Sequence, residues 1–162
     1  MSDNYAVING KRVELTDEQV KTLGIERKNP FERVAKSEMY CYIDAFDEVH
    51  CFSDGMEQCD DKSFECSNYF NDEDFAKQVA LHQLLYRKLL KFGYDNNCED
   101  KEWNGTNDHW LIVYHPSIDN FIISNMQCAK EHSVYFSTEE GASRAINEVI
   151  RPFMKEHPDF VW

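Results

Sequence analysis

The pattern of apolar and polar residues predicts two strand-rich segments with the same order of elements. Large apolar residues alternate in the period-2 manner of a β-strand at 39–44 (MYCYID) and at 109–114 (HWLIVY). Each run is followed by a turn and a second extended run, EVHCFS at 48–53 and NFIISN at 120–125. Each segment should therefore contain a pair of strands joined by a turn.

Nearly the same phrase follows both predicted strand pairs. It reads NYFNDEDFA at 68–76 and VYFSTEEGA at 134–142, and in both copies a Tyr-Phe pair precedes a helix start. The order strand, turn, strand, short strand, helix thus occurs twice. Tandem duplication of one unit explains the likeness economically. The alternative is two similar local solutions to starting a helix.

Both Tyr-Phe pairs are followed by residues typical of a helix N-terminus. In the first copy we expect Asn71 as the N-cap, with Asp74 at the N3 position. In the second copy Ser137 and Glu140 are expected to form a capping box. Acidic residues fill both first turns, where the helix dipole favours negative charge.

The two predicted helices differ in the width of their apolar faces. Residues 75–92 are apolar around most of the helix, which indicates a central, mostly buried helix. Residues 142–153 carry a narrower stripe, and Pro152 should kink or restart that helix. The apolar residues Phe160 and Trp162 predict that the C-terminal tail docks on the body.

The first 36 residues look separate from the repeated units. YAVINGKRVEL predicts a β-hairpin around Asn9-Gly10. Thr16 and Gln19 predict a capped short helix that ends at Gly24. A two-stranded hairpin is marginal alone, so this arm should pack on the body, on a second copy or on a partner.

Together these elements predict an α+β fold made of antiparallel sheets and helices. We expect an N-terminal arm of hairpin and short helix at 1–36, a first strand–strand–strand–helix unit at 37–93, and a second unit with a docked tail at 94–162. A chain of 162 residues suits one such domain with an appended arm.

Charge is concentrated in one part of the chain. The net charge is −13, and residues 44–74 contain eleven acidic residues against Lys62 alone. Such a surface repels phosphate and favours basic protein partners, so direct nucleic-acid binding is not expected. The alternative is a solvated acidic face that only keeps the protein soluble. The candidate partner-binding residues are Asp44, Asp47, Glu48, Asp54, Glu57, Asp60, Asp61 and Glu65.

Four of these acidic residues surround Gly55 between strand signals, namely Asp54, Glu57, Asp60 and Asp61. We place them in an exposed loop. Neutralising any one of them should then change the free energy of unfolding by about 0.5 kcal/mol or less.

The six cysteines do not indicate a disulfide framework, because the chain is large and begins without a signal-peptide pattern. His50, Cys51, Cys59 and Cys66 could meet as metal ligands, but there is no C-x-x-C knuckle. The cysteines are instead expected to act as small apolar residues on strands and loops. No calcium loop of the D-x-D-x-D-G type is present, so neither a metal nor another cofactor is expected.

Catalytic motifs do not stand out. Phosphate-binding glycine loops, G-x-S-x-G and H-E-x-x-H are missing from the sequence. Cys128 and His132 lie four residues apart without a third group to orient the base. We therefore assign no catalytic residues, although acids lining a hydrolase pocket remain an alternative. No apolar run approaches the roughly 20 residues of a membrane span, and a cytoplasmic location is expected.

Several segments resemble a family of small acidic proteins encoded by phages and prophages of Firmicutes. The similar segments are 8–24, 29–43, 68–70, 82–92, 134–146 and 153–162. The shared residues are turn, cap and core residues, and the family supplies no catalytic residues to transfer. This chain has Cys41 between Tyr40 and Tyr42, where the family commonly has aromatic residues, which makes a thiol role for Cys41 doubtful.

The resemblance implies an accessory protein that acts by stoichiometric binding in the host cell cytoplasm. Small acidic phage proteins are often inhibitors of host machinery, including anti-CRISPR proteins and nucleic-acid mimics. We therefore expect a bacterial partner, such as a CRISPR effector or another basic nucleic-acid-binding protein, whose channel or PAM-reading cleft is blocked. The alternatives are a phage structural or regulatory adaptor that self-associates or binds a phage protein, and an unrecognised enzyme. Either a monomer or a homodimer is compatible with the sequence.

Overall fold

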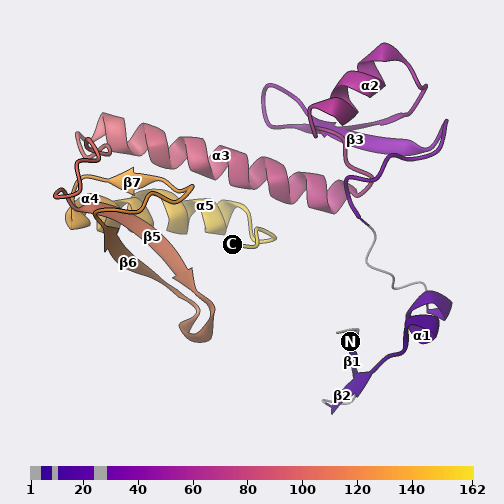
Figure 1. Ribbon diagram of the computed structural model, residues 1–162, viewed down its shortest axis with the longest axis horizontal. Helices are drawn as coiled ribbons and strands as arrows, with labels where there is room; N and C mark the ends of the chain where they lie inside the picture. The colour runs from indigo at the N-terminus through magenta and orange to yellow at the C-terminus, as the bar shows by residue number, and fades with distance from the viewer. Residues whose placement is uncertain (1–4, 9–10, 24–28) are drawn as a thin grey trace.

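The protein has the predicted α+β fold, seen in a computed structural model that describes residues 5–8, 11–23 and 29–162 (Figure 1). In the N-terminal arm, β1 (Tyr5–Ile8) pairs antiparallel with β2 (Lys11–Glu14), and α1 (Asp17–Thr22) follows. In Figure 1 the elements β1, β2 and α1 lie apart from the rest of the molecule.

The predicted capping box of the arm is confirmed. Gln19 N–H donates to Thr16 Oγ1 at 3.2 Å, and Thr16 N–H donates to Gln19 Oε1 at 2.9 Å. The predicted turn at Asn9-Gly10 and the predicted helix end at Gly24 lie outside the described residues.

The first sheet is a hairpin with one added bridge. β3 (Met39–Ile43) pairs antiparallel with β4 (Val49–Ser53). On the other side of β3, Phe70 exchanges two backbone hydrogen bonds with Cys41, at 2.7 and 2.8 Å. Helix α2 (Gln58–Glu65) lies between these strands and the bridge in sequence, and the long helix α3 (Glu73–Asp95) follows.

The second sheet has the strand order β6-β5-β7. β5 (His109–His115) pairs antiparallel with β6 (Asn120–Met126) and, on its other edge, with β7 (Tyr135–Phe136). The turn between β5 and β6 contains the short 3-10 helix η1 (Pro116–Ile118). The chain then forms α4 (Glu139–Ala145), a π-helical turn η2 (Ile146–Ile150) and α5 (Arg151–Glu156).

Both Tyr-Phe pairs therefore lie beside the first strand of a hairpin and before a helix. The predicted N-caps are wrong by one residue in both copies. Asp72 caps α3 by accepting from Phe75 N–H, and Thr138 caps α4 by accepting from Gly141 N–H. The expected cap Asn71 instead donates its side-chain amide to the carbonyls of Asn29 and Glu32. The other expected cap, Ser137, is held by a backbone bond from its N–H to the Cys98 carbonyl at 3.0 Å. Tandem duplication stays a hypothesis.

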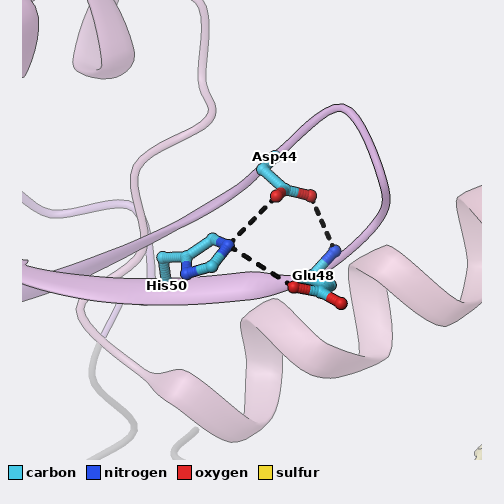
Figure 2. A group of neighbouring side chains, drawn as sticks. All are labelled: Asp44, Glu48 and His50. Atoms are coloured by element: carbon cyan, nitrogen blue, oxygen red, sulfur yellow. Dashed lines mark hydrogen bonds and ion pairs between the residues drawn. The ribbon is translucent and has the colours of Figure 1, made fainter.

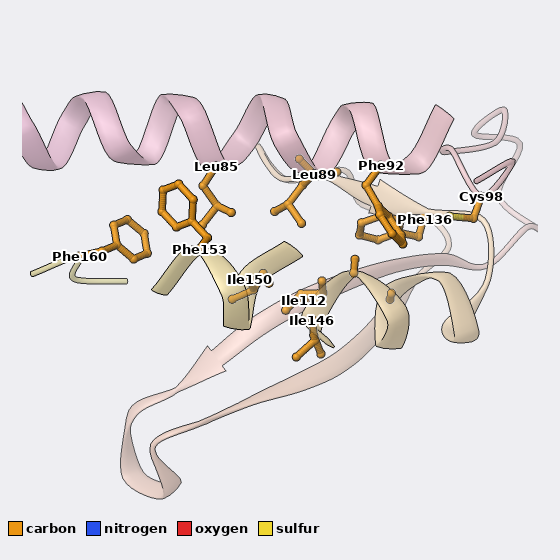
Figure 3. Packing of buried hydrophobic residues seen from close by; sticks show 13 residues of the cluster. Leu85, Leu89, Phe92, Cys98, Ile112, Phe136, Ile146, Ile150, Phe153 and Phe160 are labelled. Carbon is orange, nitrogen blue, oxygen red and sulfur yellow. The ribbon is translucent and has the colours of Figure 1, made fainter. Parts of the chain in front are cut away.

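Helix α3 is shared by two apolar cores. Ala76 and Ala80, near its N-terminus, pack with the first sheet, whereas its later residues Leu85, Leu89 and Phe92 pack with the second sheet and α4–α5 (Figure 3). The prediction of a mostly buried helix is wrong, because the cores cover only part of its circumference. The side chains left exposed include Tyr86, Leu90 and Tyr94.

The C-terminal segment closes the larger core. The predicted kink or restart at Pro152 is not a break in the helix, because the chain stays helical from α4 through the π-helical turn η2 into α5, whose first turn contains the proline. The predicted docking of the tail is confirmed for Phe160, which is buried among Leu85, Phe153 and their neighbours. Gln78 of α3 holds the tail through hydrogen bonds to the Asp159 carbonyl and the Val161 N–H.

The segment before β3 is attached to the first sheet. The ring of Phe31 lies 5.3 Å from that of Phe70 and 5.4 Å from that of Phe75. Arg33 forms an ion pair with Asp54. Residues 29–36 thus contact the body, so a truncation that spares these contacts ends at residue 28. The predicted division of the chain into three parts stays a prediction.

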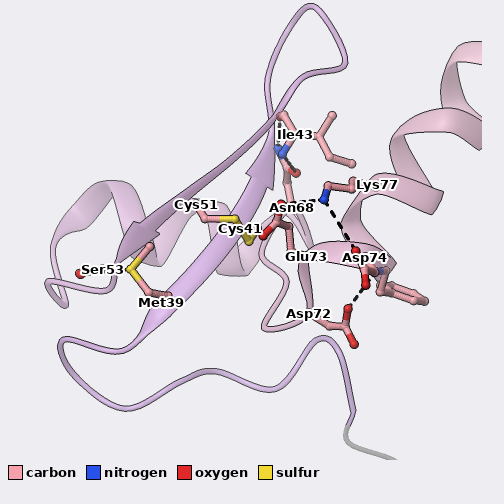
Figure 4. The surroundings of a disulfide bond; sticks show 11 residues. Met39, Cys41, Ile43, Cys51, Ser53, Asn68, Asp72, Glu73, Asp74 and Lys77 are labelled. Atoms are coloured by element: carbon pink, nitrogen blue, oxygen red, sulfur yellow. Dashed lines mark hydrogen bonds and ion pairs between the residues drawn. A yellow bond between two sulfur atoms is a disulfide. The ribbon is translucent and has the colours of Figure 1, made fainter.

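A disulfide joins Cys41 to Cys51, and the prediction of unpaired cysteines is wrong for these two (Figure 4). The residues are directly opposite in the β3–β4 register. Since the backbone groups of Cys41 bond to Phe70, this pair is a non-hydrogen-bonded position of the hairpin, where side chains approach most closely. Sequence spacing alone does not reveal such a pairing. Cys59, Cys66, Cys98 and Cys128 are free thiols.

Reduction of this disulfide should destabilise the fold without abolishing it. The two cysteines are ten residues apart in sequence. A cross-link over this distance lowers the entropy of the unfolded chain and should stabilise the fold by about 2–3 kcal/mol. Chemical denaturation of the wild type and of a Cys41→Ala/Cys51→Ala variant, each with and without dithiothreitol, measures this. The reductant should lower the stability of the wild type only. Equal effects on both proteins would mean that the bond does not form in solution.

Removal of residues 1–28 should leave the body folded, because both cores are built from residues beyond this point. We expect the melting temperature to change by less than about 4 °C. Removal of residues 1–36 serves as the comparison, since it also deletes Phe31 and Arg33. That variant should melt at least about 5 °C below the shorter truncation. Complete unfolding of the 1–28 deletion would contradict this boundary.

Candidate functional site

The eight acidic residues predicted to bind a partner do not form one surface. Asp54, Asp60 and Asp61 belong to a network with Arg33 and two tyrosines. Asp44, Asp47 and Glu48 lie at the β3–β4 turn, whereas Glu57 and Glu65 are exposed at the two ends of α2. Each group therefore has to be considered by itself.

Asp54 is fully buried, so its predicted place in an exposed loop is wrong. Arg33 Nε lies 3.0 Å from Asp54 Oδ2, and the same oxygen accepts from the Tyr69 hydroxyl at 2.8 Å. The other oxygen accepts from Met56 N–H at 2.7 Å. Arg33 also pairs with the half-exposed Asp61, with 2.7 Å between the charged groups.

Asp60 is buried as well, which is a second correction to the exposed loop. It accepts from the Tyr40 hydroxyl at 2.8 Å and from the N–H groups of Gly55 and Glu57 at 3.0 and 2.9 Å. Glu57 and Asp60 form the capping box of α2, a helix that the sequence reading missed although these two residues have the spacing of a cap. The rings of Tyr40 and Tyr69 stack 4.1 Å apart between the two carboxylates.

The pKa values of the network reflect these contacts. The Arg33 guanidinium is the main cause that lowers the pKa of Asp54 to about 2. Burial, followed by the hydrogen bond to Asp54, raises the pKa of Tyr69 to about 12. Burial and the bond to Asp60 do the same for Tyr40, also to about 12. The buried carboxylates of Asp54 and Asp60 therefore join the segment before β3, the β3–β4 hairpin, α2 and Tyr69, and they are not accessible to a partner.

The β3–β4 turn holds three polar side chains close together (Figure 2). Asp44 Oδ1 accepts from Phe46 N–H at 2.8 Å and from Glu48 N–H at 2.9 Å, and its Oδ2 lies 3.0 Å from His50 Nε2. Glu48 Oε2 lies 3.9 Å from the same nitrogen. Asp47, at the same turn, forms an ion pair with Arg87 of α3.

A cleft of about 1140 Å³ opens beside this turn, between the hairpin, the N-terminal half of α3 and the C-terminal segment. Its floor is partly apolar, with Phe75, Ala80 and Leu81 from α3 and Val161 from the tail. Among the described residues that line it, six are acidic and Lys77 is the one Lys or Arg. The acidic residues are Asp47, Glu48, Asp72, Asp74, Glu156 and Asp159.

A second polar group is buried at the start of β5. His109 Nδ1 lies 2.6 Å from Asp100 Oδ1, and the imidazole stacks on Trp103 at 3.7 Å. Trp103 Nε1–H donates to the other Asp100 oxygen at 2.9 Å. His109 is fully buried, its Nε2 lacks a hydrogen-bond partner, and the side chains packed on its ring are Trp103 and Tyr135.

Comparisons with protein-family models, with curated proteins and with solved structures found no match for this chain. The resemblance to phage proteins and the absence of catalytic residues therefore stay predictions. Among the described residues, no helix combines the length and the apolar character that crossing a bilayer requires. The acidic cleft is the candidate functional site. It was not predicted from the sequence, because its lining comes from three separate segments, 47–50, 72–81 and 156–161.

Asp54→Asn should destabilise the protein by about 2 kcal/mol or more at pH 7, because charge-assisted hydrogen bonds to a buried carboxylate are lost. The effect should depend on pH. Because the pKa of Asp54 in the folded protein is about 2, below the ordinary aspartate pKa of 3.8, its contribution to stability is present above about pH 4 and is lost as pH falls towards 2. The difference in unfolding free energy between wild type and variant should therefore narrow over that range.

Asp61→Asn is the matched control for this titration. The Asp61 side chain is 51% exposed and pairs with the same arginine as Asp54. The substitution should therefore lower the free energy of unfolding by less than about 1 kcal/mol. Urea denaturation of the three proteins at several pH values between 2 and 7 provides the measurement. Equal and pH-independent losses for both variants would contradict the role given to Asp54.

Proposed function

We propose that the chain is a binding protein whose acidic cleft takes a basic segment of a bacterial nucleic-acid-handling protein. The best candidate is an inhibitor of a nucleic-acid-targeting defence complex, similar in action to anti-CRISPR proteins and located in the host cytoplasm. The observation that supports this proposal is the cleft itself, with six carboxylates against one lysine among its described lining. A concave surface of one charge focuses the electrostatic field and attracts oppositely charged partners.

The cleft suits a lysine- or arginine-rich helix or loop. Asp74, Glu156 and Asp159 are exposed and can meet cationic head groups, with Asp74 also 3.7 Å from Lys77 Nζ. The apolar floor at Phe75 and Leu81 can contact the aliphatic stems of the same side chains. A partner that normally binds phosphate through such residues would then lose access to nucleic acid while it is bound here.

This proposal moves the binding surface away from most of the residues predicted from the sequence. Of the eight, Asp47 and Glu48 line the cleft. Asp47 already pairs with Arg87, so Glu48 has the freer carboxylate of the two. Phe46, 83% exposed at the same turn, adds an apolar contact beside the charged residues. Buried aromatic anchors are typical of interface centres.

A second candidate is an adaptor that associates through the N-terminal arm. It is favoured by two exposed apolar residues there, Val13 at 41% and Leu23 at 62% exposure. Apolar contacts respond weakly to salt, whereas ionic contacts of the cleft weaken as salt screens them. The two candidates therefore predict different salt dependence for the same captured partner.

The test compares two triple variants with the same change in charge. Asp74→Asn/Glu156→Gln/Asp159→Asn alters the cleft, and Glu65→Gln/Glu102→Gln/Glu131→Gln alters exposed acids outside the cleft lining. Calorimetric titration with an arginine-rich peptide at low salt should show about tenfold weaker binding for the cleft variant. The affinity of the control variant for the peptide should stay within about twofold of the wild-type affinity, because its substitutions change the electrostatic potential at the cleft only a little.

The biological partner is sought by affinity capture from bacterial lysate at low and high salt, followed by mass spectrometry. We expect a basic nucleic-acid-binding protein that the control variant retains and the cleft variant loses. Its nuclease or binding activity should be inhibited at one-to-one stoichiometry. Inhibition by the cleft variant at wild-type strength would refute the cleft as the binding site, and turnover at sub-stoichiometric amounts would indicate an enzyme.

A further inference from the structure

Three potential metal ligands meet at the end of the first hairpin. One ligand atom from each of Asp44, Glu48 and His50 can be chosen so that all lie within 4.8 Å of one another. We propose that these three side chains bind a divalent transition-metal ion, with Zn²⁺ as the best fit. The sequence reading expected no metal here, and this inference does not rest on the proposed binding function.

The hairpin brings the three side chains to one face. Asp44 N–H bonds to the Glu48 carbonyl at 2.9 Å, so these residues are opposite each other one step beyond the Ile43–Val49 pair. Glu48 immediately precedes β4 and His50 lies two residues further on within it, and side chains at this spacing along an extended chain share a face. The disulfide one pair beyond Tyr42 and His50 ties the two strands together. Backbone hydrogen bonds of the hairpin and the neighbouring disulfide thus hold the three side chains in place.

Asp44 is oriented for binding. Its Oδ1 is occupied by the N–H groups of Phe46 and Glu48, and its Oδ2 faces His50 Nε2. Hydrogen bonds to a ligating carboxylate fix its direction. The turn thus holds Asp44 Oδ2 towards His50 Nε2.

The donor set selects the kind of metal. Zn²⁺ binds imidazole nitrogen and carboxylate oxygen at about 2.0–2.2 Å, and three protein ligands leave one position for water or another group. Imidazole suits Zn²⁺, Cu²⁺, Ni²⁺ and Fe²⁺, whereas Mg²⁺ and Ca²⁺ prefer oxygen ligands alone. The His50 and Glu48 side chains are 38% and 73% exposed, so an ion can enter from solvent. Both residues also line the cleft. The fourth coordination position of the ion, which no protein side chain fills, would therefore face a partner bound in the cleft.

The exposed thiols require a suitable background for the test, because thiolates also bind Zn²⁺. Cys59, Cys66 and Cys128 are exposed and are replaced by serine, and the disulfide is left intact. The full chain is freed of metal with a chelator and titrated with ZnCl₂ by calorimetry, with MgCl₂ in a parallel titration. We expect one Zn²⁺ per chain and binding of Mg²⁺ at least about tenfold weaker.

Two single variants locate the ion. His50→Ala and Glu48→Gln should each weaken Zn²⁺ binding by at least about tenfold. The matched controls are His115→Ala, an exposed histidine at the end of the other hairpin's first strand, and Glu65→Gln; both should bind Zn²⁺ as the parent does. Far-ultraviolet circular dichroism of all four variants shows whether each keeps its fold.

Co²⁺ provides a readout that does not depend on affinity. Its absorption spectrum should show ligand-field bands without a thiolate charge-transfer band, and His50→Ala should abolish the bands. The proposal is overturned if the parent takes up no Zn²⁺, if His50→Ala binds as the parent does while folded, or if the spectrum shows thiolate ligation. Loss of peptide binding in the cleft variant with Zn²⁺ binding intact would separate this site from the proposed function.

Discussion

The burial of α3 against two separate sheets is the contact on which the rest of the structure depends. Small residues, Ala76 and Ala80, let the first sheet approach the helix closely, whereas Leu85, Leu89 and Phe92 fill the larger second core. Neither hairpin has a core of comparable size without this helix, and isolated hairpins are marginally stable in water. The cleft follows from the same arrangement, because it opens where the first hairpin, the N-terminal half of α3 and the C-terminal segment meet.

Features with a local cause were predictable from the sequence. Period-2 alternation gave both hairpins, and the Tyr-Phe pairs were placed correctly before helices because capping residues lie next to them. The caps lie one residue later than predicted. In the first copy the Asn71 side chain donates to the carbonyls of residues 29 and 32, and Asp72 caps α3; in the second copy the Ser137 N–H bonds to the Cys98 carbonyl, and Thr138 caps α4. Local preference could not reveal these partners.

The acidic segment shows where composition misleads. Counting charges treats every carboxylate as exposed, but Asp54 and Asp60 are buried with Arg33, Tyr40 and Tyr69 around them. Arg33 lies 21 residues before Asp54, outside any window used to read a loop. Some acidic residues of the segment therefore belong to the buried network around Arg33, and only a few have carboxylates that are free to meet a partner. The disulfide was missed for a similar reason, because only the strand register places Cys41 opposite Cys51.

The same hairpin thus carries the disulfide, the three potential metal ligands and one wall of the cleft. Reducing conditions in a cytoplasm oppose disulfides. Cys41 would still fill its place in the core as a thiol, since its buried side chain packs beside Ile43 and Phe70. The backbone ladder of β3 and β4 would keep Asp44 opposite Glu48, so loss of the covalent link changes stability more than it changes the position of the ligands. A bound divalent cation would tie Asp44 at one end of the turn to His50 at the other, replacing part of that constraint while lowering the negative charge of the cleft wall.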